Sequence, residues 1–337
     1  MPSLSPKENY LRCLRHEEYE YVPFLHFGPG GGDVGLAGFF PSEVGGPSTG
    51  FVDGFGVHWA ASDSAAGGLI PEPGKFLLED ITRWKKDVTI PDVEQYDWEK
   101  IASGGPPIDR DKMPLAITGN CGAWERLAAL MGFEGAMIAM MEEPEATFEL
   151  LTAITDYKIA LAKKTKKYFD ADTFTNFDDI ATERNLFMSP ETYRLLLKPQ
   201  HIRLNKAVRE LGMIPIQHTC GHAELCVEDY IETDAAAWNS VQPTNDLAAI
   251  LDKYGDRFCL EGGFDSNGKP GRPEATIEDI KAEVERCFRE YGSKRGYVFN
   301  DLLVFSKDSK DVEAKHQAII ETANRLRYEA YREHPYK

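Results

Sequence analysis

Residues 213–242, MIPIQHTCGHAELCVEDYIETDAAAWNSVQ, decide how the chain is expected to fold. An apolar run over 213–217 is followed by polar residues, an amphipathic segment over 223–231, and a second apolar run over 236–241. The two short runs have the length of buried strands, and the segment between them has the length and pattern of a crossover helix. This stretch therefore predicts one parallel β-strand, helix, β-strand unit.

The same alternation extends from this unit towards both ends of the chain. Eight strands and the intervening helices are expected, and eight parallel units favour a closed (β/α)8 TIM barrel over an open doubly wound sheet, which is the alternative. Residues 1–337 would then form a single barrel domain with an N-terminal extension. The expected strands are 21–26, one within 51–60, 115–119, 173–177, 213–217, 236–241, 257–260 and 297–300. The expected helices are 6–16, 123–131, 144–169, 189–211, 223–231, 247–254, one from about 276, and 312–332.

A long segment near the N-terminus, residues 28–74, does not follow this rhythm. It is rich in glycine and aromatic residues, and within it residues 51–59 alternate like a bent hairpin. A structureless segment of this length is improbable in a compact domain unless it covers a functional site. We therefore expect it to be a long loop over the mouth of the barrel.

The charge balance restricts the class of partner. The chain carries 38 Lys and Arg against 55 Asp and Glu, a formal net charge of −17, which would repel nucleic acid and anionic membranes. No apolar run is long enough to span a bilayer, and residues 1–10 lack the apolar core of a signal peptide. The six scattered cysteines are typical of reduced thiols, so a cytoplasmic protein acting on a small molecule is expected, with another protein as a possible partner.

Polar side chains gather where the expected strands end, which is where a barrel places its catalytic groups. Loops are polar in any protein, but that does not account for a neighbouring histidine and cysteine. We therefore expect an enzyme. The expected catalytic residues are Asp178, His218 and Cys220, and the expected substrate contacts are His26, Asn120, Asp179, Gln242, Asp265 and Asn300.

The segment His218-Thr-Cys220 is the most specific local feature. Residues two apart on an extended chain point to the same side, so an imidazole and a thiolate could share a Zn²⁺ ion. The alternative is a hydrogen-bonded histidine beside a half-buried cysteine, without metal. The further zinc ligands would come from Cys226, Glu261, His222 or Cys259.

Asp178 and Asp179 follow another expected strand. Adjacent residues of an extended chain face opposite ways, so only one should point into the site. We expect Asp178 to orient the substrate or donate a proton, and Asp179 could instead cap a following turn.

Taken in order, these motifs resemble the uroporphyrinogen decarboxylase superfamily, and within it the methyltransferases that serve corrinoid proteins. The resemblance covers nearly the whole chain. Its motifs are RCLRHE (12–17), VP (22–23), FGVHW (55–59), PDV (91–93), DDI (178–180), MSPE (188–191), KP (198–199), HTCG (218–221), YGD (254–256) and EGGFD (261–265).

The resemblance implies a (β/α)8 barrel, commonly a homodimer, with one of two chemistries. Genuine uroporphyrinogen decarboxylases carry a basic N-terminal segment for the substrate's carboxylates, which HFGPGG (26–31) replaces here. The zinc methyltransferases carry His-X-Cys, matched by His218 and Cys220, and a further cysteine near the last strand. Residues 296–304 contain no cysteine, so Cys226 or Glu261 would have to substitute.

The sequence thus predicts a methyltransferase that moves a methyl group between a small methylated compound and a corrinoid protein or cofactor, possibly assisted by zinc. One alternative is a metal-free decarboxylase of uroporphyrinogen type. The other is a barrel that binds without catalysis.

Overall fold

The computed structural model describes residues 2–26, 28, 30, 32–37, 51–62, 68–104, 108–303, 305 and 308–333. Eight strands form one parallel sheet in the order β1-β11-β10-β9-β8-β7-β6-β2, which curls into a barrel and confirms the expected (β/α)8 architecture. The strands are β1 (Phe24–Leu25), β2 (Gly35–Ala37), β6 (Leu115–Gly119), β7 (Thr173–Phe177), β8 (Ile214–His218), β9 (Ala237–Val241), β10 (Cys259–Gly263) and β11 (Tyr297–Asn300).

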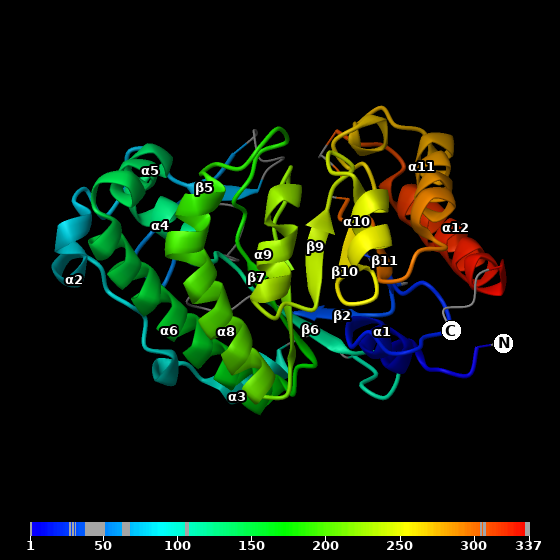
Figure 1. The fold of residues 1–337 in the computed structure, drawn as a ribbon, viewed down its shortest axis with the longest axis horizontal. Helices are drawn as coiled ribbons and strands as arrows, with labels where there is room; N and C mark the ends of the chain where they lie inside the picture. The colour runs from blue at the N-terminus through cyan, green and yellow to red at the C-terminus, as the bar shows by residue number, and fades with distance from the viewer. Residues whose placement is uncertain are drawn as a thin grey trace.

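Helices surround these strands. In Figure 1, α6 and α8 lie towards one end of the molecule and α11 and α12 towards the other, with the strands between them. The principal helices are α1 (Pro6–Leu14), α4 (Ala123–Met131), α5 (Phe133–Glu142), α6 (Pro144–Phe169), α8 (Lys198–Glu210), α9 (Val227–Glu232), α10 (Leu247–Tyr254), α11 (Ile277–Tyr291) and α12 (Val312–Glu333). Shorter helical segments are η2 (Ile81–Arg83), α2 (Trp84–Asp87), η3 (Val93–Gln95), α3 (Trp98–Ser103), α7 (Pro190–Thr192), η4 (Tyr193–Leu197), η5 (Glu224–Cys226) and η6 (Lys269–Gly271). In the described part of the chain, no helix combines the length and apolar character that a membrane span needs.

The two end strands of the sheet, β1 and β2, meet at a seam that a buried ion pair holds. The backbone N–H of Asp33 donates to the carbonyl of Phe24 at 2.7 Å, and the Asp33 carboxylate accepts the N–H of Phe24 at 3.0 Å. Arg327 of α12 binds this carboxylate at 2.9 Å. Because both side chains are buried, the last helix is fastened to the point where the barrel closes.

The second barrel strand is not where the sequence placed it. Residues 51–60 contribute β3 (Phe51–Val52) and β4 (His58–Ala61), which pair antiparallel with each other and, through β4, with β5 (Leu69–Pro71) in a separate small sheet. The barrel strand is β2, which pairs with β6. Three residues are too few to show a periodic pattern, whereas the hairpin-like alternation in 51–59 was real. The described part of 28–74 is therefore partly regular, and residues 27, 29, 31, 38–50 and 63–67 lie outside the described residues.

Candidate functional site

A cavity of about 610 Å³ opens beside the carboxyl ends of β6 and β7. Its walls are mostly apolar and aromatic, and β4 and β5 of the small sheet form one of them. The residues that line it are Trp59, Leu69, Ile70, Pro71, Phe76, Asn120, Cys121, Trp124, Glu125, Ala128, Ala129, Gly132, Phe133, Phe177, Asp179 and Phe187. Part of the segment expected over the barrel mouth thus lines this cavity.

Asp179, which lines the cavity, forms a cluster with His218 and Cys220, which do not line it. The His218 ring stacks on Phe177, with centroids 3.6 Å apart and planes 14° from parallel. Its Nε2 lies 3.5 Å from Cys220 Sγ and 3.7 Å from Asp179 Oδ1. One ligand atom from each of the three residues lies within 4.8 Å of the others, close enough for all three to contact one metal ion.

The register of the barrel strands fixes the tautomer of His218. His218 pairs with Asn239 of β9, and Asn239 pairs with Glu261 of β10, so the three side chains form a row. Asn239 Nδ2 donates to Glu261 Oε2 at 2.8 Å, which turns Asn239 Oδ1 towards His218 Nδ1 at 2.6 Å. Nδ1 must then carry the proton, and Nε2 presents a lone pair to Cys220 and Asp179. This is the form of histidine that binds a metal or accepts a proton.

Burial governs protonation in the cluster. Burial lowers the pKa of His218, against the opposing charge of Asp179. Burial also raises the pKa of the Cys220 thiol well above its usual value, and the charges of Asp179 and Glu125 add to this shift. Without a cation the imidazole and the thiol are therefore neutral at pH 7. A bound divalent ion would reverse this preference for the thiol, because it stabilises the thiolate directly.

Glu125 brings a second carboxyl group into the cavity. Burial raises the pKa of Glu125 well above its usual value, and the charges of Asp179 and Asp178 raise it further. This shift favours the carboxylic acid form, which can donate a hydrogen bond to a molecule in the cavity. The sequence did not single out Glu125, because it lies in the first turn of a helix and not directly after a strand.

The two adjacent aspartates have exchanged their expected positions. Asp178 is fully buried and accepts the N–H groups of Trp124 at 3.3 Å and Glu125 at 3.0 Å, at the start of α4. Its carboxylate also lies 3.0 Å from His201 Nε2. Asp178 therefore caps α4, whose own N-cap, Gly122, has no side chain for the purpose. Only one aspartate faces the cavity, as expected, but it is Asp179 and not Asp178.

The other expected zinc ligands lie outside the cluster. Glu261 contacts Asn239 and accepts from Tyr10 Oη at 2.7 Å inside the barrel. Cys226 is fully buried, and Cys259 lies against Cys13, with sulfurs 3.8 Å apart. His222 Nδ1 contacts the Thr244 carbonyl at 2.7 Å. All six cysteines are free thiols. None of these four candidates joins His218 and Cys220, so within the described residues the third ligand that the structure offers is Asp179.

The expected substrate contacts are divided among three cavities. Asn120 and Asp179 line the large cavity. His26 and Asn300 line a small one of about 60 Å³ in the barrel interior, together with His218, Asn239 and Glu261. Gln242 and Asp265 line a third, polar cavity. The interior residue that the sequence missed is Asn239, and a polar residue within an otherwise apolar strand was the available signal.

Comparison with known proteins identifies a family and solved structures of similar fold. Residues 109–301, more than half of the chain, match the family described as Uroporphyrinogen decarboxylase (URO-D). Among solved structures, a methyltransferase from Methanosarcina mazei superimposes with a TM-score of 0.71 at 14% identity, covering 96% of this chain and 99% of that one. At this identity the likeness shows the fold alone.

Other structures are more distant. An AP endonuclease from Brucella melitensis has a TM-score of 0.39 at 12% identity over 69% of this chain and 85% of its own. No curated protein sequence matches the chain.

Proposed function

Because the chain belongs to the uroporphyrinogen decarboxylase family, we propose that it is a methyltransferase, transferring a methyl group between a small methylated compound and a corrinoid protein or cofactor. The observation that carries the proposal is the cluster of Asp179, His218 and Cys220, of which Asp179 lines a large apolar cavity. A nitrogen, a sulfur and an oxygen atom of these residues converge where a substrate in the cavity could meet them.

The donor set of this cluster fits a zinc ion. His218 Nε2, Cys220 Sγ and an Asp179 oxygen would hold it, and three protein ligands leave a position for substrate. Bound there, zinc would act as a Lewis acid on the heteroatom that carries or receives the methyl group. Asp179 would then take the role for which the resemblance implied a further cysteine.

The walls of the cavity favour a neutral compound with an apolar body. None of the described residues that line it is Lys or Arg, so a substrate with many carboxylates would find no counter-ion. This disfavours the alternative of a uroporphyrinogen decarboxylase. Aromatic side chains such as Trp124, Phe133 and Phe187 can instead enclose a flat apolar group and exclude water from it.

A protein side chain can supply the proton that the reaction requires. When a methyl group leaves a heteroatom, the heteroatom keeps the bonding electron pair and becomes basic. Glu125, whose protonated form is favoured because burial raises its pKa, can donate its proton to that atom. Phe177 and Asn239 hold the His218 ring in place throughout.

The test combines metal analysis with a methyl-transfer assay. Purified protein is incubated with cob(I)alamin and a panel of methyl ethers, methyl thioethers and methylamines, and methylcobalamin is followed by its absorbance. We expect about one zinc ion at this cluster, and loss of zinc and turnover in His218→Ala and Cys220→Ala. His222→Ala, a nearby histidine outside the cluster, is the matched control. Unchanged turnover in Cys220→Ala, or conversion of uroporphyrinogen to coproporphyrinogen, would contradict the proposal.

A further inference from the structure

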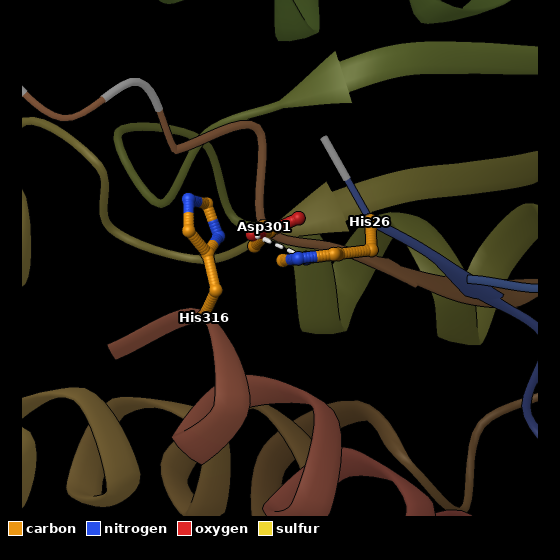
Figure 2. A group of neighbouring side chains, drawn as sticks. All are labelled: His26, Asp301 and His316. Carbon is orange, nitrogen blue, oxygen red and sulfur yellow. Dashed lines mark hydrogen bonds and ion pairs between the residues drawn. The ribbon is translucent and has the colours of Figure 1, made fainter. Parts of the chain in front are cut away.

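A second group of potential metal ligands lies on a different wall of the barrel. His26 directly follows β1, Asp301 directly follows β11, and His316 lies in the first turns of α12 (Figure 2). None of the three belongs to the cluster of Asp179, His218 and Cys220. One potential ligand atom from each lies within 4.8 Å of the others.

Hydrogen bonding prepares His26 as a ligand. Its Nδ1 lies 3.0 Å from Asp301 Oδ2, and both side chains are completely buried. An ionised carboxylate accepts the Nδ1 proton, so Nε2 carries the lone pair. A carboxylate behind a histidine is a common arrangement at metal sites, because it orients the ring and makes it more basic. The His316 ring stands edge-on to His26, with centroids 5.0 Å apart.

Two ring nitrogens in this group have no hydrogen-bond partner among the described residues. They are His26 Nε2 and His316 Nδ1, and both atoms are buried. A buried polar atom left without a partner destabilises the folded state, so such atoms normally have a ligand, an ion or a water molecule. Two of them on neighbouring rings point to a single shared partner.

Gly28 lies close to both of these nitrogens. A Cβ at this position would stand 2.6 Å from His26 Nε2 and would also overlap His316 Nδ1. Any side chain here would therefore push against both rings. A glycine is required at position 28 for the two rings to keep these positions.

We propose that His26 Nε2 and His316 Nδ1 bind a divalent transition-metal ion such as Zn²⁺, and that Asp301 orients the His26 ring through Nδ1. Imidazole ligands suit the borderline ions of the first transition row, whereas Mg²⁺ and Ca²⁺ prefer oxygen ligands alone.

The ion would fasten the last helix to the barrel seam. His26 extends from end strand β1, Asp301 from its neighbour β11, and His316 from α12, the helix that also supplies Arg327 to Asp33. A metal ion bound only by the folded protein stabilises it, and the stabilisation grows with the logarithm of the free metal concentration above Kd. The second site is therefore structural, and it does not depend on the proposed methyl transfer.

Cobalt(II) distinguishes the two sites by spectroscopy. The full chain is stripped of metal and titrated with Co²⁺ as wild type and as Cys220→Ser. A cobalt ion at the first cluster shows a thiolate-to-cobalt charge-transfer band, whereas one held by His26 and His316 shows visible d–d bands alone. We expect two equivalents in the wild type, and one without the thiolate band in Cys220→Ser.

Two further changes test the ligands in the Cys220→Ser background. His316→Ala and Gly28→Ala should each abolish binding of the one remaining cobalt ion and the rise in melting temperature that this ion causes. The control His222→Ala should retain the bound ion and the rise in melting temperature. The alanine at position 28 retains every proposed ligand, so this change tests whether the two rings must keep their positions. Absence of cobalt binding in Cys220→Ser, or binding unaffected by these changes, would overturn the proposal. If the wild type binds cobalt but shows no thiolate band, that result would instead contradict the first site.

Discussion

Glu261 makes the stability of the barrel depend on pH. It lies inside the barrel, where burial raises its pKa to about 7 from 4.5, while hydrogen bonds from Tyr10 and Asn239 limit the shift. The folded state therefore binds a proton more tightly than the unfolded chain between these two values. Stability contributed by this group is fully present at low pH and is lost as pH rises towards 7.

The size of the effect follows from the shift. Each pKa unit corresponds to about 1.4 kcal/mol, so the raised pKa of Glu261 destabilises the folded state relative to the unfolded chain by about 3 kcal/mol at pH 8 and about 1 kcal/mol at pH 5. Glu261→Gln removes the titration. Relative to the variant, the wild type should lose about 2 kcal/mol of unfolding free energy between pH 5 and pH 8.

Urea denaturation of both proteins at several pH values measures this difference. Subtracting the variant from the wild type removes every other titrating group, and Glu142→Gln on the exposed face of α5 serves as the control. The control should show no such dependence. A constant difference between wild type and Glu261→Gln from pH 5 to pH 8 would refute the reasoning, since it would mean that folding does not raise the pKa of this group.

Three other outcomes are expected. Arg327→Met leaves the Asp33 carboxylate buried without its partner, so it should lower the unfolding free energy by about 3–5 kcal/mol in urea titrations, and adding Asp33→Asn should recover part of the loss. Asn239→Leu removes the acceptor that orients the imidazole of the first cluster, so zinc affinity measured by competition with a chelator should fall about 10–100-fold while circular dichroism is unchanged. In metal-free protein Cys220 should react slowly with iodoacetamide at pH 7, and Asp179→Asn should accelerate the reaction, because the aspartate charge helps to raise the thiol pKa.

The barrel could be predicted because its signals are local. Apolar runs of strand length separated by amphipathic helices identify parallel units wherever the strands have four or five residues, as β6 to β11 have. The second strand was not predicted, because β2 has only three residues and its place is set by pairing with β6 and not by its own sequence pattern. The nearby alternation in 51–59 belonged to a different sheet.

The site could be predicted only to the level of strand ends. His218 and Cys220 were found because two reactive side chains two residues apart must share a face. The choice between Asp178 and Asp179 needed a tertiary fact, namely that α4 begins with Gly122 and takes its cap from a neighbouring strand. Spacing along the chain does not predict such a contact. It also does not predict which residue supplies the third metal ligand.

The row formed by His218, Asn239 and Glu261 shows what the barrel adds to the sequence. Each residue is a polar position within its own strand, and nothing local relates one to another. Parallel register places them side by side across β8, β9 and β10, so that an ionised Glu261 orders the amide of Asn239 and thereby the proton on His218. A shift of one residue in either pairing would turn one side chain out of the barrel and break the row. The metal-binding form of His218 is therefore a consequence of strand register, and a carboxyl group with a pKa of about 7 can control it from inside the barrel.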